Sequence, residues 1–127
     1  MVDLSKYTIL VVDDDEDLRD LMISIFEMNG FTVVSADSGI TAFELVKTTH
    51  INLVVSDMRM PGGNGLELLE KVRKYNPEIP VVIFVTGFTD VSIKECLAKG
   101  ANAVFAKPFN QIDLINSAKT ALKIPLL

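Results

Sequence analysis

Five short runs of apolar, mostly β-branched residues alternate with amphipathic stretches along the chain. The runs occupy residues 8–12, 31–36, 53–57, 80–86 and 103–106. Their length and composition are typical of β-strands, and the stretches between them have the spacing of helices with one apolar face. Because the alternation is strict and several strands are apolar on both faces, the sequence predicts an α/β fold. In this fold, helices cover both sides of a five-stranded parallel sheet.

Residues that favour helix ends mark where the predicted helices begin and end. Glycines at positions 30 and 100 should end the first and fourth helices, because glycine readily adopts the left-handed conformation that follows a helix. Side chains that can accept a hydrogen bond from the first turn precede the later helices. These predicted N-caps are Ser38, Asn64, Thr89 and Asn110.

Composition limits both the size of the protein and its class of partner. A chain of 127 residues with 49% hydrophobic residues is enough for one packed core, so we expect a single domain over residues 1–127. The formal net charge is −5, and the 12 Lys and Arg residues are scattered. Direct binding to nucleic acid needs clustered positive charge, so it is not expected.

Cysteine content and hydropathy indicate the compartment. Cys96 is the only cysteine, which excludes an internal disulfide and a cysteine-based metal cluster. No apolar run reaches the ~20 residues of a membrane span, and residues 1–8 lack the pattern of a secretory signal. We therefore expect a cytoplasmic protein without membrane contacts.

Polar residues follow four of the five predicted strands. Ligands of parallel sheets bind at the carboxyl ends of the strands, beside the point where the strand order reverses. The second strand has no comparable polar end, which predicts that it is an outer strand and that the order is 2-1-3-4-5. The first and third strands would then be neighbours, with the acidic residues of both at one edge. The residues at these strand ends are Asp13, Asp14, Asp57, Thr86 and Lys107.

The residue types at these strand ends suggest phosphoryl chemistry. Three neighbouring carboxylates bind a hard divalent cation, and Mg²⁺ suits a site with few protein oxygens. Asp57 can also attack phosphorus and form an acyl phosphate. A cation, an ammonium and a hydroxyl would help by neutralising and positioning the transferred group, and Mg²⁺, Lys107 and Thr86 supply one of each.

Four motifs at the ends of four predicted strands carry a resemblance to a known family. They are VVDDDEDLR (11–19), VVSDMRMPGGNGLELL (54–69), VTG (85–87) and AKPF (106–109). In this order and spacing they resemble the receiver domain of bacterial two-component response regulators. The resemblance implies a flavodoxin-like doubly wound (βα)5 fold with the strand order given above, so the two predictions are not independent.

The resemblance implies a role for each motif residue. Asp57 resembles the phosphoacceptor, and Asp13 and Asp14 resemble the acidic pair that binds Mg²⁺, with the backbone carbonyl of Arg59 as a third protein ligand. Thr86 and Lys107 resemble the hydroxyl and the ammonium that contact the phosphoryl group. A cis peptide bond at Lys107–Pro108 would resemble the tight turn of the family, and we predict one. The remaining acidic residue of the motif, Asp15, is better explained as a helix N-cap.

One position departs from the family pattern. Receivers commonly have Tyr or Phe three residues before the lysine, and this chain has Val104. Phe105 is adjacent but should face the other side of the sheet, because side chains alternate along a strand. The coupling between threonine and aromatic ring that is usual in the family is therefore expected to be weakened or rerouted.

The predicted function is a switch in which a sensor histidine kinase or a phosphotransfer protein phosphorylates Asp57 with Mg²⁺ bound. Phosphorylation would then alter the face made by the fourth helix, fifth strand and fifth helix, and so the binding of a downstream effector domain or protein. Two alternatives stay open. The chain could be an interaction module that is never phosphorylated, or a phosphatase of the haloacid dehalogenase type. The latter needs an acid two residues after the nucleophile, where this chain has Arg59.

Overall fold

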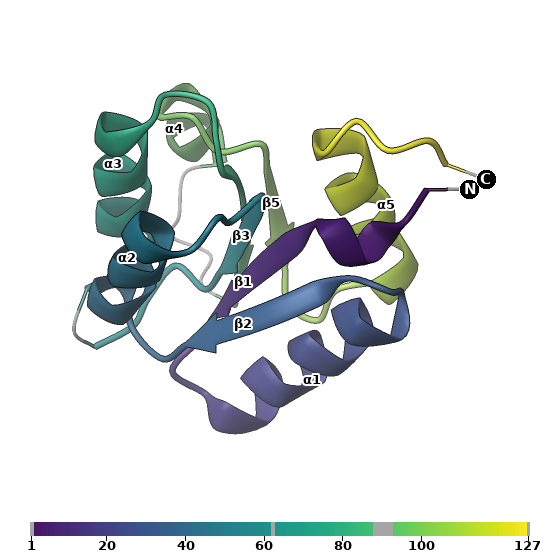
Figure 1. Cartoon of the computed structure of the whole chain (residues 1–127). Coiled ribbons are helices and arrows are strands. Elements are labelled where there is room, and N and C mark those ends of the chain that lie inside the picture. Colours follow the sequence, from purple (N-terminus) through teal and green to yellow (C-terminus); the bar gives the residue numbers. More distant parts are fainter. Residues whose placement is uncertain (1, 62, 88–92, 127) are drawn as a thin grey trace.

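The computed structural model describes residues 2–61, 63–87 and 93–126. A five-stranded parallel sheet forms its centre, and helices follow each strand (Figure 1). The strands are β1 (Thr8–Val12), β2 (Thr32–Ala36), β3 (Leu53–Ser56), β4 (Val81–Thr86) and β5 (Ala103–Ala106). A short 3-10 helix, η1 (Leu4–Lys6), precedes five α-helices: α1 (Glu16–Met28), α2 (Gly39–Thr48), α3 (Gly65–Tyr75), α4 (Ile93–Ala98) and α5 (Gln111–Ala121).

The strand order is 2-1-3-4-5, which confirms the prediction. Three strands are one residue shorter than predicted, because Phe31, Asp57 and Pro80 lie outside the paired ladders. Proline has no N–H to contribute to a ladder. For Asp57, the backbone N–H still donates to Val12 O (2.9 Å), so this residue continues directly from β3 at the edge where β1 also ends.

Alternate residues of each strand pack into two separate cores, one on each face of the sheet. One core includes Leu10, Val54 and Phe84 and is covered by α2, α3 and α4; the other includes Ile9, Val55 and Ile83 and is covered by α1 and α5. Figure 1 shows these two helix layers on opposite sides of the sheet. Burial on both faces explains why the central strands consist almost wholly of Val, Ile and Leu.

Four of the predicted caps are present in the structure. Side chains of Asp15, Ser38, Asn64 and Asn110 each accept a hydrogen bond from a backbone N–H three residues later. The predicted cap Thr89 lies outside the described residues. Helix ends at the predicted glycines also agree, since Gly30 and Gly100 have φ values of +97° and +109°.

Loss of the cap on α1 provides a test of local stability. Asp15 Oδ1 accepts the Leu18 N–H at 3.2 Å. Replacing Asp15 with alanine is expected to lower the free energy of unfolding by about 1 kcal/mol, as measured by urea denaturation. Asp15→Asn should retain wild-type stability because asparagine caps equally well. Equal stability of the alanine variant would show that the cap contributes nothing.

Among the described residues, no helix has both the length and the apolar character required to cross a membrane.

Two methionines of the loop after β3, Met58 and Met60, are buried in the core beneath α3. Their burial indicates a role in packing, so the neighbouring acidic site offers oxygen ligands.

Candidate functional site

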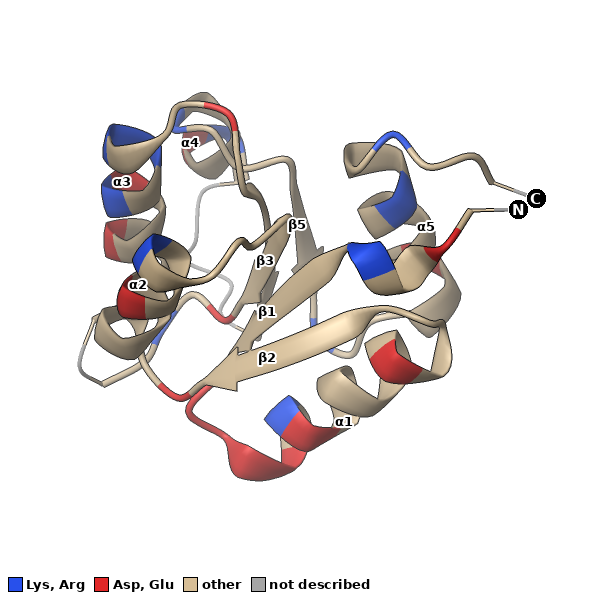
Figure 2. Ribbon diagram, viewed as in Figure 1, with Lys and Arg blue, Asp and Glu red and all other residues tan. Residues whose placement is uncertain are grey.

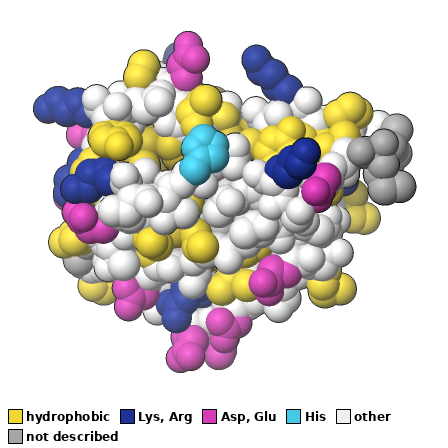
Figure 3. All heavy atoms as spheres, in the orientation of Figure 1, with side chains coloured by type: hydrophobic (Ala, Val, Ile, Leu, Met, Phe, Trp, Pro, Cys, Tyr) yellow, Lys and Arg dark blue, Asp and Glu magenta, His cyan; other side chains and the backbone are white. Residues whose placement is uncertain are grey.

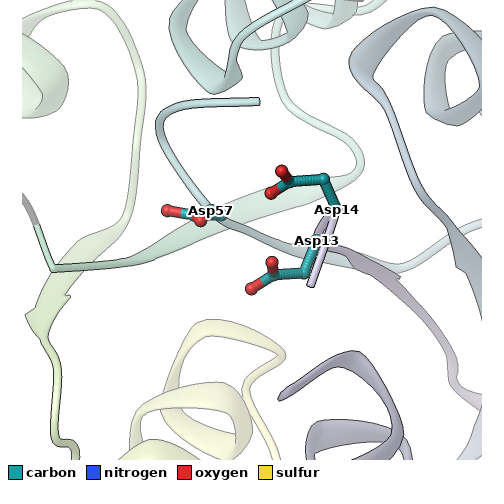
Figure 4. A group of neighbouring side chains, drawn as sticks. All are labelled: Asp13, Asp14 and Asp57. Carbon is teal, nitrogen blue, oxygen red and sulfur yellow. The ribbon is translucent and has the colours of Figure 1, made fainter. Parts of the chain in front are cut away.

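Parallel pairing of β1 with β3 brings three aspartates together at the carboxyl edge of the sheet. Val12 is paired with Ser56, so the residues that follow, Asp13 and Asp57, leave neighbouring strands at the same level. Each of Asp13, Asp14 and Asp57 offers a carboxylate oxygen within 4.8 Å of the others. The three carboxyl groups extend to the same side of the strand ends (Figure 4). The strand order therefore creates a shared acidic site from residues 44 positions apart.

Lys107 joins this site from the end of β5. Its Nζ lies 3.2 Å from Asp57 Oδ2 and 3.5 Å from Asp13 Oδ2. The Lys107 N–H donates to Thr86 O at 2.9 Å, which fixes its backbone beside the end of β4. The Lys107–Pro108 peptide bond is cis, as predicted. One ammonium thus contacts carboxylates from two other strands.

Backbone donors fix the orientation of the two buried carboxylates. Asp57 Oδ1 accepts the Met58 N–H at 2.7 Å, and Asp13 Oδ1 accepts the Asp15 N–H at 2.9 Å. In both residues the other oxygen, Oδ2, is the one that faces Lys107. Each carboxylate therefore presents one oxygen to the shared site while the other is held by its own loop.

Burial makes the negative charge of this site costly. Asp13 is fully buried and Asp57 is 5% exposed, whereas Asp14 is exposed. The pKa of Asp13 is raised, chiefly because burial removes its carboxylate from water and further because of the nearby charge of Asp57. The Asp15 N–H and Lys107 oppose this rise. Three carboxylates with one ammonium leave an excess of negative charge that a divalent cation would neutralise.

The donor set fits Mg²⁺. Hard cations of this kind bind carboxylate oxygens and retain several waters, and the site offers three carboxylates on one edge with one of them open to solvent. The residues that would hold the ion are Asp13, Asp14 and Asp57. No sulfur or imidazole ligand lies in this group of side chains, so the chemistry does not favour a softer metal.

The fold and the site geometry agree with what comparison with known protein families finds. The family model of the response regulator receiver domain matches residues 9–119. This chain belongs to the response regulator receiver domain family.

Similar receivers occur both as short proteins and as parts of longer ones. The chain is 32% identical over 91% of its length to sporulation initiation phosphotransferase F of Bacillus subtilis, of which it covers 94%. It is 36% identical over 90% of its length to the C4-dicarboxylate transport transcriptional regulatory protein DctD of Rhizobium meliloti, of which it covers 25%. Several other curated relatives are likewise matched over only a quarter to a half of their length.

Solved receiver structures have the same fold. The structure of a CheY-like response regulator receiver domain protein from Methanospirillum hungatei has a TM-score of 0.84 and 33% identity, covering 92% of this chain and 94% of that one. The doubly wound fold predicted from the sequence is therefore the receiver fold.

Two further residues predicted for the receiver site lie at its margin. Thr86 is 4% exposed at the end of β4, where it is paired with Ala106 of β5, next to Lys107. Arg59 is exposed and, with Pro61 and Asn64, lines an open surface pocket beside the loop after β3. The catalytic role of Thr86 and the metal-binding role of the Arg59 carbonyl stay predictions.

Val104, where the chain departs from the family pattern, and Phe105 point to opposite faces of the sheet, as strand alternation predicts. Val104 packs against the core beneath α2, α3 and α4, whereas Phe105 packs against the opposite core. Val104 is paired with Phe84, two residues before Thr86, so it lies on the same face of the sheet as the threonine. Phe105 therefore cannot replace an aromatic ring on that face.

His50, the only histidine, lies before β3 at the opposite end of the strands from the aspartates. It is exposed, and Figure 3 shows it on the surface of the molecule. Its Nε2 lies 3.5 Å from Asn52 Nδ2. His50 and Asp57 therefore lie at opposite ends of β3, and His50 is not part of the acidic site.

Sequence reasoning did not identify Gly65 as a residue that shapes the site. A Cβ atom at this position would lie 2.5 Å from Asp57 O, 2.8 Å from Phe84 Cε1 and 3.1 Å from Met58 Cα. The Gly65 N–H also donates to Met58 O at 2.7 Å. The start of α3 therefore packs directly on the backbone that carries Asp57. The available signal was the Asn64–Gly65 pair that opens the helix, but from it the sequence predicts only a cap at Asn64.

The raised pKa of Asp13 predicts how stability depends on pH. Since the folded receiver binds the Asp13 proton more tightly than the unfolded chain, this residue contributes stability below its usual pKa of about 4, and that contribution is lost as pH rises through the folded pKa. Without Mg²⁺, Asp13→Asn is therefore expected to be more stable than wild type at pH 7. This advantage should shrink toward pH 4.

Denaturant unfolding at pH 4, 5, 6 and 7 measures this difference. Adding Mg²⁺ at ten times its Kd should stabilise the wild type by about 1.4 kcal/mol and so reduce the advantage of the variant at pH 7 by up to that amount. If Asp13→Asn is less stable than the wild type at pH 7 with EDTA present, burial of the charged Asp13 carboxylate does not destabilise the fold.

Proposed function

We propose that Asp57 is the phosphoacceptor of this receiver and that Mg²⁺ binds beside it on Asp13 and Asp14, with the Arg59 carbonyl as a further ligand. The observation that carries the proposal is the contact of Lys107 Nζ with both Asp57 (3.2 Å) and Asp13 (3.5 Å). It joins a nucleophilic carboxylate, an acidic pair and an ammonium in one site, which is the set that phosphoryl transfer to an aspartate requires.

The reaction follows from the positions of these groups. A carboxylate oxygen of Asp57 forms a bond to phosphorus while the P–N bond of a phosphohistidine breaks, and the imidazole nitrogen keeps the electron pair and takes up a proton. With a small acyl phosphate, a P–O bond breaks instead. Lys107 would contact the phosphoryl oxygens and Thr86 would donate a hydroxyl hydrogen bond to them. Mg²⁺, when bound by Asp13, Asp14 and Asp57, would supply positive charge that offsets the negative charge of the transferred group.

Hydrolysis of the acyl phosphate would complete the cycle. Water attacks phosphorus, the bond to the Asp57 oxygen breaks, and the carboxylate and inorganic phosphate are released. We propose that the chain supplies this transfer and autodephosphorylation chemistry itself but is not an enzyme acting on a separate substrate. The phosphorylated state would differ from the free state at Thr86 and at the α4–β5–α5 face.

The proposed partners are a sensor histidine kinase or phosphotransfer protein as donor and an effector domain or protein as output. Relatives named as transcriptional regulators support the second part. We further propose that residues 1–127 form one receiver unit and that it works in the cytoplasm. Cys96 is a free buried thiol, and a lone unpaired thiol is typical of reducing compartments.

Intact-mass measurement after incubation with acetyl phosphate tests the proposal. With Mg²⁺ present, the chain should gain the mass of one phosphoryl group, and with EDTA in excess the gain should fall by at least about tenfold. No gain with any donor, including a phosphorylated histidine phosphotransfer protein, would identify an interaction module that is not phosphorylated. Steady phosphate release from many phosphate esters would identify a phosphatase.

A further inference from the structure

Four hydrogen bonds between backbone atoms close a ring around the acidic site. They run from the Asp13 N–H to Ala36 O (3.2 Å), from the Gly39 N–H to Gly63 O (3.1 Å), from the Gly65 N–H to Met58 O (2.7 Å) and from the Asp57 N–H to Val12 O (2.9 Å). The bonds join the ends of β1, β2 and β3 to the starts of α2 and α3. The ring therefore links β1 to the loop after β3 by a path through α2, in addition to the direct pairing of β1 with β3.

One segment of this ring, residues 36–39, holds none of the carboxylates that form the acidic group among the described residues. Its one acidic side chain, Asp37, is exposed. The segment bonds to the site at both ends, because Ala36 O accepts from the residue after β1 and the Gly39 N–H donates to the loop after β3. Figure 2 shows the acidic residues of the connections after β1 and β2 at the same end of the sheet. The contribution of this segment to the site is therefore the position that it gives to its neighbours.

Gly39 has no space for a side chain. A Cβ atom at this position would lie 2.6 Å from Gly63 O, 3.1 Å from Gly63 C and 3.3 Å from Asn64 O, which are all backbone atoms. Gly39 is buried and is the first residue of α2, directly after the N-cap Ser38. A Cβ atom at Gly63 would likewise lie 3.4 Å from Ile40 N. The start of α2 thus packs backbone to backbone on the loop after β3, and Figure 1 shows the two segments side by side.

We propose that this ring sets the spacing between the acidic pair and the loop after β3, and that Gly39 is a positioning residue for Mg²⁺. The inference rests on the proposed function, in which the acidic pair holds the ion from the end of β1 and the Arg59 carbonyl holds it from that loop. Arg59 lies between the two loop residues whose carbonyls the ring bonds fix, Met58 and Gly63. Mg²⁺ requires oxygen ligands at about 2.0–2.1 Å in a nearly octahedral arrangement, so a small shift of the loop would weaken binding.

Titration with Mg²⁺ in the absence of a phosphoryl donor tests the proposal, with the amide NMR shifts of Asp13 and Asp57 as the readout. Gly39→Ala is expected to raise the Mg²⁺ Kd at least about tenfold, because the new methyl group pushes Gly63 O away from α2. The acetyl phosphate reaction should then need correspondingly more Mg²⁺. Its rate at saturating Mg²⁺ should stay within about threefold of the wild-type rate, because Asp57 keeps its own hydrogen bond from the Met58 N–H.

Two further variants separate positioning from a general loss of stability. Val46→Ala truncates a buried side chain near the other end of α2, so it should lower stability and leave the Mg²⁺ Kd unchanged. Gly63→Ala strains the same hydrogen bond from the other side, because Gly63 has a φ of +110°, and it should raise the Kd as Gly39→Ala does. Urea denaturation verifies that each variant is folded, and Gly63→Ala decides the question if Gly39→Ala does not fold.

A Mg²⁺ Kd that stays at the wild-type value in the folded glycine variants would overturn the inference, as would an equal rise in Val46→Ala. If the wild type itself bound no Mg²⁺, the metal site of the proposed function would be wrong and the inference would fall with it. The titration uses no phosphoryl donor, so a failure of Asp57 to accept phosphate would refute the proposed acceptor without changing this result. The two proposals can therefore be told apart when one of them fails.

Discussion

Replacing Asp57 with asparagine is expected to lower the rate of phosphoryl gain from acetyl phosphate and Mg²⁺ by ~10³-fold or more. Asparagine has nearly the same size and can still accept the Met58 N–H, now 2.7 Å from Asp57 Oδ1, so the loop after β3 should keep its shape. Its amide lacks the negative oxygen that attacks phosphorus. Intact-mass spectrometry over time gives the rate directly.

A matched variant separates this effect from a general loss of acidic charge. Asp15→Asn removes one carboxylate from the same acidic run but retains the cap on α1, and it should be phosphorylated at the wild-type rate. If Asp57→Asn still gained a phosphoryl group at a comparable rate, the acceptor would be another residue and the proposed function would be wrong.

Replacing Gly65 with alanine is expected to destabilise the fold by about 3 kcal/mol and to slow phosphorylation of Asp57. The new methyl group would lie 2.5 Å from Asp57 O and 3.1 Å from Met58 Cα. Both are backbone atoms, so they cannot move away by a change of side-chain rotamer. Relief requires α3 to move away from the end of β3, and this changes the direction of the Asp57 side chain. Urea denaturation and the acetyl phosphate reaction measure the two effects.

The control for this prediction is a glycine that lies near the site with more space around it. A Cβ atom at Gly87 would have Lys107 Cδ as its nearest neighbour, at 3.8 Å, which is an ordinary contact. Gly87→Ala should therefore cost less than about 1 kcal/mol. Equal stability of the two variants would mean that the close approach at Gly65 does not limit packing.

The fold could be predicted from the sequence because each strand has its own local signal. Burial on both faces gives continuous runs such as TILVV, and capping side chains such as Asp15 and Asn64 lie where the helices begin. The strand order followed from which strand ends carry polar residues. The meeting of Lys107 with Asp57 was expected on the same grounds, because the carboxyl ends of parallel strands share one edge.

Features that depend on distances across the sheet had no such signal. The packing of Gly65 on Asp57, the bond from Arg19 to Asp13 O and the raised pKa of Asp13 all arise only when separate elements are in contact. The cis bond at Ile79–Pro80 was likewise not anticipated, although the one before Pro108 was. The chemical roles assigned to Asp57, Thr86, Lys107 and the Arg59 carbonyl are still predictions, of which the Asp57→Asn variant tests the first.

The reach of Lys107 to Asp57 and Asp13 spans 50 and 94 residues of sequence. During synthesis on the ribosome, the aspartates emerge well before Lys107, so the contacts between its ammonium and the two carboxylates can form only after β5 has been made. The proposed phosphorylation of Asp57 would therefore require a chain that extends through β5.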